Sequence, residues 1–330
     1  MPSFPTIVHA RRFRIVPAPA LVLGAMLFVA CQESPVAPPA TRPALAASLL
    51  ERGASNSERA FEFTTIDVPG ALSTSSSGIN ARGDIVGSYV DGTHHSHGYI
   101  LRDGQFTTID FPGSAFTEAL GISPKGEVVG DYRFAGEPAP VNLHGYMRTK
   151  KGAFVPVNDP PHINTVAQRI LPDGTIIGCR HDTDQMSTMR GIVIRHGVIT
   201  ELDKFGSMNT GGTPDGERIV GFYSNMATNR VEGYLIDDGE FTPLVVPGST
   251  ITRAFDINPA GEIVGVYVNP PGVFHGFVLM DGSYVSIDVP GATATRAWGI
   301  NARGDIVGVY ATTDGKTHGF LRSLTREDER

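Results

Sequence analysis

Two arginines could give this chain a binding site for an anionic group. Arg253 and Arg296 stand 43 residues apart, at equivalent positions of two repeated segments. A guanidinium group binds a carboxylate or sulfate through paired N–H donors, so two neighbouring arginines favour an anionic ligand. Glu118 holds the same position in another repeat, the one that starts at Phe106, and would face the two arginines. Trp298 would lie close by. In the alternative, the arginines pack against Phe255 and Trp298 or pair with local acids.

Four histidines recur at one repeat position, each directly before a glycine: His97, His144, His275 and His318. They could form a metal-binding ring, but equivalent residues of successive repeats point into separate gaps, whereas metal ligands converge at about 2 Å. We therefore expect no metal or other cofactor, and a local hydrogen bond that recurs with the repeat.

Cysteine chemistry is limited to Cys31 and Cys179. Cys179 falls in a strand-like segment, where other repeats have Ser88, Val266 and Val309, so we interpret it as a packing thiol rather than a nucleophile. The chain has neither a GxSxG nor an HExxH motif, and we assign no catalytic residue.

An internal repeat positions these residues. A segment like FTTIDVPG is followed by one like GINARGDIVG and then by HGYI or HGF, and successive repeats start 42 to 48 residues apart. The six starts are Phe63, Phe106, Phe154, Ile199, Phe241 and Tyr284. A period of roughly 40 to 50 residues, read as four short strands per unit, is typical of a β-propeller blade.

The sixth repeat displays its strands most clearly. Residues 295–301 alternate small and large side chains, which suits the crowded innermost strand A. A tight turn then leads into strand B at 305–310, and strand C follows at 318–322. The FTTID-type segment, strand D, carries a proline near its end in most repeats. Because proline lacks the N–H that a central strand must donate, we place D at the outer edge of the blade.

The strand count predicts how the fold closes. Strands A, B and C occur six times, but no D strand follows the last set, and a D-type strand at 61–69 stands alone before the first A strand. We therefore predict an all-β fold over residues 61–323, a six-bladed β-propeller of four-stranded blades in which the N-terminal strand completes the last blade. An open β-solenoid is the alternative.

Residues 1–31 indicate export. Three arginines precede an apolar run of ten residues ending at Ala30, which is too short to span a bilayer and is typical of a signal peptide. The segment LFVAC resembles a bacterial lipobox, which implies lipidation of Cys31 and anchoring in the envelope, at the outer membrane or cell surface. A plain secretory signal is the alternative. Residues 32–60 are interpreted as a flexible Pro/Ala/Ser linker, and 324–330 as a charged tail.

The charge of the mature chain restricts its partners. Of 27 Lys and Arg, three lie in residues 1–31, which contain no acid, so 24 remain against 34 Asp and Glu. The resulting net charge of −10 argues against nucleic acid as a partner.

The short period, the GIN–GDIVG hairpin and the HGF or HGY segment resemble the HAF-type extracellular repeats of bacteria over residues 61–323. The third repeat departs from this pattern, with Arg169-Ile170-Leu171 for GIN and Arg190-Gly191-Ile192 for HGF, and the fourth has Glu232-Gly233-Tyr234. The resemblance implies a secreted or surface-exposed propeller and brings no defined catalytic site.

From these features we expect an exported, membrane-anchored, non-enzymatic repeat protein. It would bind a small molecule, glycan or protein through the face formed by the variable B–C loops and D–A connections. We expect a monomer that contacts the membrane through its lipid anchor alone. A propeller enzyme acting on a polysaccharide or lactone, and a structural or adhesion protein of the envelope, are the alternatives.

Overall fold

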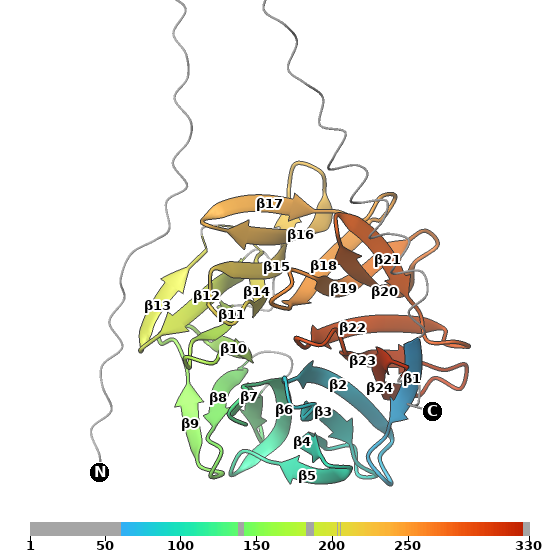
Figure 1. Cartoon of the computed structure of the whole chain (residues 1–330). Coiled ribbons are helices and arrows are strands. Elements are labelled where there is room, and N and C mark those ends of the chain that lie inside the picture. The colour runs from blue at the N-terminus through green and yellow to red at the C-terminus, as the bar shows by residue number, and fades with distance from the viewer. Residues whose placement is uncertain (1–60, 138–141, 183–187, 203, 205, 326–330) are drawn as a thin grey trace, which may run out of the picture. The chain divides into compact units, whose positions relative to one another are not determined.

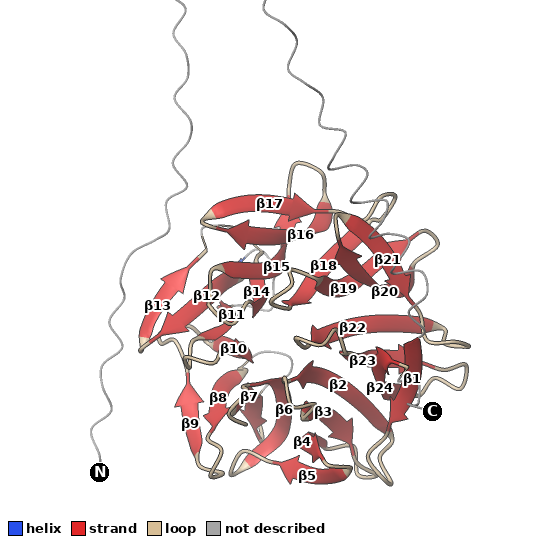
Figure 2. Cartoon of the chain, in the orientation of Figure 1, coloured by secondary structure: helices blue, strands red, loops and turns tan. Residues whose placement is uncertain are grey.

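The computed structural model describes residues 61–137, 142–182, 188–202, 204 and 206–325. They form an all-β, propeller-like fold whose sheets are arranged around a central axis (Figure 1), with turns and loops joining the strands (Figure 2). Cys31, the predicted signal segment and the predicted linker lie outside the described residues.

The first three blades follow one another along the chain. The strands of blade 1 are β2 (Ser73–Ile79), β3 (Ile85–Val90), β4 (Ser96–Arg102) and β5 (Gln105–Ile109). Those of blade 2 are β6 (Ser114–Ile122), β7 (Val128–Phe134), β8 (His144–Arg148) and β9 (Phe154–Val157). Those of blade 3 are β10 (Asn164–Ile170), β11 (Ile176–His181), β12 (Arg190–Arg195) and β13 (Val198–Glu201).

The other three groups repeat this order, except that the last includes the first strand of the fold. The strands of blade 4 are β14 (Met208–Gly212), β15 (Arg218–Asn225), β16 (Arg230–Asp237) and β17 (Glu240–Leu244). Those of blade 5 are β18 (Ile251–Ile257), β19 (Ile263–Asn269), β20 (Val273–Met280) and β21 (Ser283–Ile287). Those of blade 6 are β22 (Ala294–Ile300), β23 (Ile306–Ala311), β24 (Thr317–Leu324) and β1 (Phe61–Ile66).

Within each blade, neighbouring strands are antiparallel and run A, B, C, D from the axis outward (Figure 1). Strand β1 takes the D position of blade 6 and pairs with β24 from Phe61 opposite Leu324 to Ile66 opposite Gly319. Single parallel bridges also connect β4 to β6 and β16 to β18. The position of the D strands at the outer edge agrees with the proline argument.

The A–B turns form for local reasons. The Oδ1 atom of Asn80 accepts hydrogen bonds from the backbone N–H groups of Arg82 and Asp84, at 2.9 and 3.1 Å, while Gly83 supplies a φ of 91°. The amide nitrogen of Asn80 then donates to the carbonyl of Ser123 on the next blade. The asparagine of the GIN segment therefore both closes its own turn and links it to the neighbouring turn.

Apolar side chains fill the spaces between blades. One cluster combines Val86 and Ile109 of blade 1 with Val128, Tyr132 and Tyr146 of blade 2, and each of these is less than 4% exposed. Similar clusters lie between other neighbouring blades. The core is therefore a series of layers around the axis, and each blade is stabilised mainly by its neighbours.

The fold has two faces with different connections. The A–B and C–D turns lie on one side, which we call the turn face, and the B–C loops and D–A connections lie on the other, the loop face. Strand A runs from the loop face to the turn face. A residue late in its A strand therefore lies beside the central axis near the turn face, and a residue early in the strand lies near the loop face.

Candidate functional site

The A strands meet most closely near the turn face. Each has a β-bulge, and the residue that follows the bulge forms what we call the inner ring. The six members of the inner ring are Gly78, Gly121, Arg169, Gly211, Asp256 and Gly299. A Cβ atom at Gly121 would lie 2.8 Å from the carbonyl oxygen of Gln168 on the next blade, so close packing favours glycine here.

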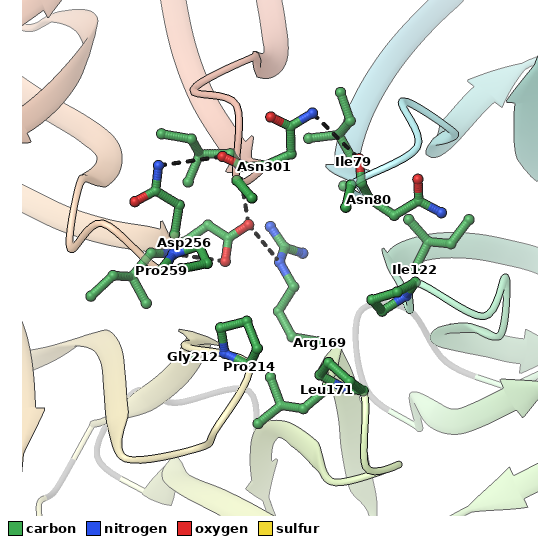
Figure 3. Close-up of a pocket in the computed structure, with 18 of the residues that line it drawn as sticks. Ile79, Asn80, Ile122, Arg169, Leu171, Gly212, Pro214, Asp256, Pro259 and Asn301 are labelled. Carbon is green, nitrogen blue, oxygen red and sulfur yellow. Dashed lines mark hydrogen bonds and ion pairs between the residues drawn. The ribbon is translucent and has the colours of Figure 1, made fainter.

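The two members that are not glycine carry opposite charges and form an ion pair. The Nε atom of Arg169 lies 3.3 Å from Oδ2 of Asp256 (Figure 3). The remaining guanidinium nitrogens donate to the carbonyls of Leu120, Ser77 and Trp298 on three other blades, as well as to Gln168. Arg169 thus connects five blades and closes the axis at this level.

Asp256 is also held by backbone donors. Its carboxylate accepts hydrogen bonds from the N–H groups of Ile257 and Ile300, at 3.0 and 3.2 Å. Burial raises the pKa of Asp256, and the positive charge of Arg169 partly offsets this increase. The two charges thus compensate each other, and the other guanidinium nitrogens and the carboxylate have backbone partners, which indicates a structural role.

A small cavity lies beside this ion pair, between the A–B turns of the turn face (Figure 3). Its volume is about 110 Å³, and its walls include Ile79, Ile122, Pro214 and Pro259. Pockets for small molecules usually measure about 300 to 1,000 Å³. This cavity therefore suits water rather than a sugar or peptide.

A second set of equivalent residues lies three positions earlier on the A strands, nearer the loop face. We call it the loop-side ring, and its members are Ser75, Glu118, Val166, Met208, Arg253 and Arg296. Three of the predicted site residues thus stand at one depth beside the axis. Trp298 follows Arg296 by two positions on β22.

Arg253 and Arg296 are partly buried, and no carboxylate pairs with either among the described residues. The Nε atom of Arg253 is buried and has no hydrogen-bond partner. Burial and, secondarily, the positive charge of Arg296 lower the pKa of Arg253 below its usual value. Burial likewise lowers the pKa of Arg296. The two cations therefore lie close together without an anion.

The aromatic partners of the arginines differ from the expected ones. Each guanidinium lies over a phenylalanine of the preceding blade, with Arg253 4.9 Å from the ring centre of Phe222 and Arg296 4.3 Å from that of Phe274. The expected partners, Phe255 and Trp298, pack edge to face on each other at 6.4 Å. The prediction erred because each side chain leans across the gap between blades, not along its own strand.

The third member of the predicted site, Glu118, belongs to an acid pair. It stands opposite Asp131 in the β6–β7 ladder, and Asp131 is 4% exposed with an Oδ1 atom that has no hydrogen-bond partner. Burial and the charge of Glu118 raise the pKa of Asp131 well above its usual range, and burial raises that of Glu118. Glu118 lies three blades from Arg253, and no ion pair joins them among the described residues.

Three of the four recurrent histidines make the same local hydrogen bond. His97, His275 and His318 bond through Nδ1 to Asp110, Asp288 and Asp67 of the adjacent D strands, at 2.7 to 3.0 Å. Each ring also stacks on a tyrosine of its own blade, as His97 does on Tyr89. The prediction is confirmed for these three histidines, whereas His144 bonds through Nε2 to Glu137 of its own B–C loop, at 3.0 Å. Among the residues that the structure describes, no group of three or more His, Cys, Asp or Glu could hold a metal ion.

Blade 3 replaces an aromatic contact by charge. In blade 2, Phe111 stacks on Tyr132 with ring centres 3.6 Å apart. The equivalent positions of blade 3 hold Asp159 and Arg180, whose Oδ2 and Nε atoms lie 3.2 Å apart. Arg180 also contacts Glu201. An ion pair in blade 3 thus takes the place that the aromatic stack has in blade 2.

Cys179 is buried on β11, with 1% of its surface exposed. Burial and, secondarily, the charge of Asp131 raise the pKa of the thiol to about 12. A thiol in this state is protonated and unreactive, so the interpretation as a packing residue is confirmed.

No helix in the described part of the chain is long and apolar enough to cross a membrane. No protein-family model and no curated protein matches the sequence. Similarity is found among solved structures.

A TolB structure from Agrobacterium tumefaciens is 16% identical, with a TM-score of 0.50, over 73% of this chain and 79% of that one. The β-propeller domain of the Trilobed protease from Pyrococcus furiosus is 11% identical over 78% of this chain and 100% of that one, with a TM-score of 0.49. The Aleuria aurantia lectin AAL is 10% identical over 79% and 96%, with a TM-score of 0.46. The likeness to the TolB structure shows the β-propeller fold.

Proposed function

We propose that this protein is an exported, lipid-anchored, non-enzymatic propeller that binds an anionic group of a glycan or peptide from its loop face. The observation that carries the proposal is the pair of arginines in the loop-side ring, Arg253 and Arg296, which lack a carboxylate partner among the described residues. Blade packing does not need them, since other repeats place Ser75, Val166 or Met208 there.

The energetics support an anionic ligand. Partly buried cations that lie near each other without a counter-ion cost free energy, because water is lost and like charges repel. A carboxylate or sulfate would restore the lost hydrogen bonds through paired N–H···O contacts. Phe222 and Phe274 hold the guanidinium planes and would provide apolar surface for a sugar or side chain.

The loop face also exposes apolar side chains. Five blades contribute one large hydrophobic residue each to its connections: Leu72, Phe134, Ile163, Met226 and Val273. Met226 is the most exposed of them, at 84%. Exposed apolar groups around a polar site are a feature of binding surfaces, which favours this face over the turn face for ligand recognition.

The test is a double substitution, Arg253→Ala with Arg296→Ala. We expect affinity for acidic oligosaccharides or acidic peptides to fall by about tenfold or more, measured by titration calorimetry. The matched control, Arg230→Ala with Lys316→Ala, removes two exposed cations of the loop face and should keep the affinity. Equal binding by both variants across a panel of acidic ligands would remove the arginines from the site.

We further propose that the six four-stranded groups are the complete set of blades and that β1 closes the ring. The antiparallel pairing of β1 with β24 supports this, as does the packing of β2 against both β23 and β24. A chain beginning at Gly70 should melt many degrees lower, because the edge of β24 becomes exposed. An unchanged melting temperature would contradict closure.

The proposed anchor is the lipidated Cys31, which rests on the lipobox-like sequence, and the proposed cell-surface location rests on the HAF-type resemblance. Labelling of cells with a fatty-acid analogue should tag the wild type and not Cys31→Ala. Labelling that persists in the variant would contradict the anchor.

The acid pair that Glu118 of the loop-side ring forms with Asp131 of β7 supports a second candidate, a propeller enzyme acting on a polysaccharide. A carboxyl with a raised pKa, such as Asp131, can act as a general acid. Asp131→Asn should then abolish the release of new chain ends from acidic polysaccharides. If the wild type releases none, the non-enzymatic proposal stands.

A further inference from the structure

A groove lined by basic residues runs across the turn face of blades 1 and 2. Its volume is about 760 Å³. Six cations line it, namely Arg82, Arg102, Lys125, Arg148, Lys150 and Lys151. The acids of its wall are Asp84 and Asp103. This excess of positive charge stands out in a chain whose net charge is negative.

Part of the groove is rigid. The buried carboxylate of Asp84 binds both Arg82 and Arg102, at 2.8 and 3.0 Å. Burial opposes ionisation, but hydrogen bonds from Arg102, Asn80 and Arg82 lower the pKa of Asp84 to about 2. Both guanidinium groups are therefore held in place, and each side chain is still about half exposed, 51% for Arg82 and 48% for Arg102.

Two of the lysines come from an insertion that the blade does not need. In blade 1 the C–D turn has two residues between the paired Arg102 and Gln105. In blade 2 it has five, between the paired Arg148 and Phe154, and they include the exposed Lys150 and Lys151. No ion pair among the described residues involves these lysines or Lys125.

The described chain starts on the same face. Phe61, the first residue of β1, pairs with Leu324 at the turn-face end of β24, so β1 runs from the turn face to the loop face. β2 of blade 1 packs against β24 of blade 6. Phe61, the first described residue, therefore lies on the face that carries the groove, one blade away from it.

The opposite side of the turn face has the opposite charge. The A–B and C–D turns of blade 4 carry five exposed acids: Asp215, Glu217, Asp237, Asp238 and Glu240. An anionic surface would attract blades 1 and 2 and repel blade 4. An anionic surface would therefore contact the edge of the turn face that blades 1 and 2 form, with blade 4 directed away from it.

We propose that the basic groove binds the headgroups of anionic lipids, so that the edge formed by blades 1 and 2 rests on the membrane and the loop face points away from it. Phosphate oxygens suit both the exposed guanidinium edges and the lysines. The contact would add electrostatic membrane affinity to that of the proposed lipid anchor. It relies on the proposed anchor only to bring the groove to a membrane, and it replaces the expectation that the anchor is the sole contact.

The experiment uses the full chain carrying Cys31→Ala, so that lipidation plays no part. We expect it to sediment with vesicles containing about 30% phosphatidylglycerol and not with pure phosphatidylcholine, and to be released by about 0.5 M NaCl. Lys150→Glu with Lys151→Glu should lower the partition coefficient by about tenfold or more, and Lys150→Gln with Lys151→Gln by less. The matched control is Arg230→Glu with Lys316→Glu on the loop face, which should bind like the parent.

Three outcomes would overturn the proposal. The first is that the parent does not bind phosphatidylglycerol vesicles. The second is that the groove and loop-face variants lose binding equally, which would indicate a general charge effect. The third is that an acidic polysaccharide such as polygalacturonate binds the groove while vesicles do not, which would assign the groove to a different ligand. None of these outcomes depends on Arg253 or Arg296, so they are separate from the test of the loop-face site.

Discussion

The inner ring and the loop-side ring lie three residues apart on the same six strands, yet they use charge in opposite ways. The inner ring departs from glycine only at Arg169 and Asp256, which pair with each other and with carbonyl and N–H groups of other blades. The loop-side ring contains Arg253 and Arg296, which have the same sign and lack a carboxylate partner among the described residues.

This difference separates structural charge from binding charge. A buried ion pair whose members also bond to the backbone of other blades holds the blades in one arrangement, and removing either member leaves an uncompensated charge. A buried cation without a partner costs stability in the free protein and can recover that cost when an anion binds. Two predictions test whether the two rings differ in this way, and a third tests Asp131, the buried acid opposite Glu118 of the loop-side ring.

The largest effect is expected for Arg169→Ala. It leaves the carboxylate of Asp256 buried without its cation and removes donors from carbonyls on four strands. We expect a loss of roughly 3–5 kcal/mol in the free energy of unfolding, measured by urea denaturation.

The control places glycine at both positions, as the other four blades have in the inner ring. Arg169→Gly with Asp256→Gly removes both charges together and should cost clearly less than the sum of the two single changes. Additive losses would mean that the pair is not coupled, and the structural interpretation of the inner ring would be wrong.

A smaller, pH-dependent effect is expected for Asp131→Asn. The folded state raises the pKa of this carboxyl, so it binds the proton more tightly than the unfolded chain, and the ionised group costs stability as pH rises from about 4 through the raised pKa. The variant should therefore gain stability relative to the wild type, and the gain should grow with pH between about 4 and 8.

Denaturant unfolding at several pH values measures this difference. Glu118 keeps its raised pKa in the variant, so part of the wild-type slope should persist. A difference that is independent of pH would show that Asp131 does not change protonation in this range.

The smallest effect, with the opposite sign to the first, is expected for Arg253→Met. Methionine fills a similar space against Phe222 without the buried charge, so the free energy of unfolding should stay constant or rise by up to about 1 kcal/mol. Arg169→Met, the matched change in the inner ring, should be strongly destabilising. If both changes destabilise to the same extent, the comparison between the rings fails.

Much of the fold followed from short stretches of sequence. The positions of prolines predicted the outer D strands, and the strands expected at 295–301, 305–310 and 318–322 agree with β22, β23 and β24 to within two residues. The histidine hydrogen bond was also predictable. Such features depend on residues close in sequence or on one neighbouring strand.

The candidate site was only partly predictable. Arg169 was recognised as a departure from the GIN pattern, but its role was missed. The available signal was that Asp256, the other departure from glycine at this position, has the opposite charge. Two opposite charges at one position of the innermost strands predict a pair across the axis, because these strands, unlike the outer ones, surround the axis directly.

The sequence by itself determined the repeat, the strand order within a blade and the turn chemistry, because each depends on local backbone preferences such as the φ of Gly83 or the side-chain hydrogen bonds of Asn80. Only the tertiary structure decided which charges meet. Arranging the blades around one axis brings Arg169 to Asp256, far along the chain, and places Phe222 and Phe274 under the arginines. These contacts depend on the angle and depth at which neighbouring blades pack, and no single repeat encodes that geometry.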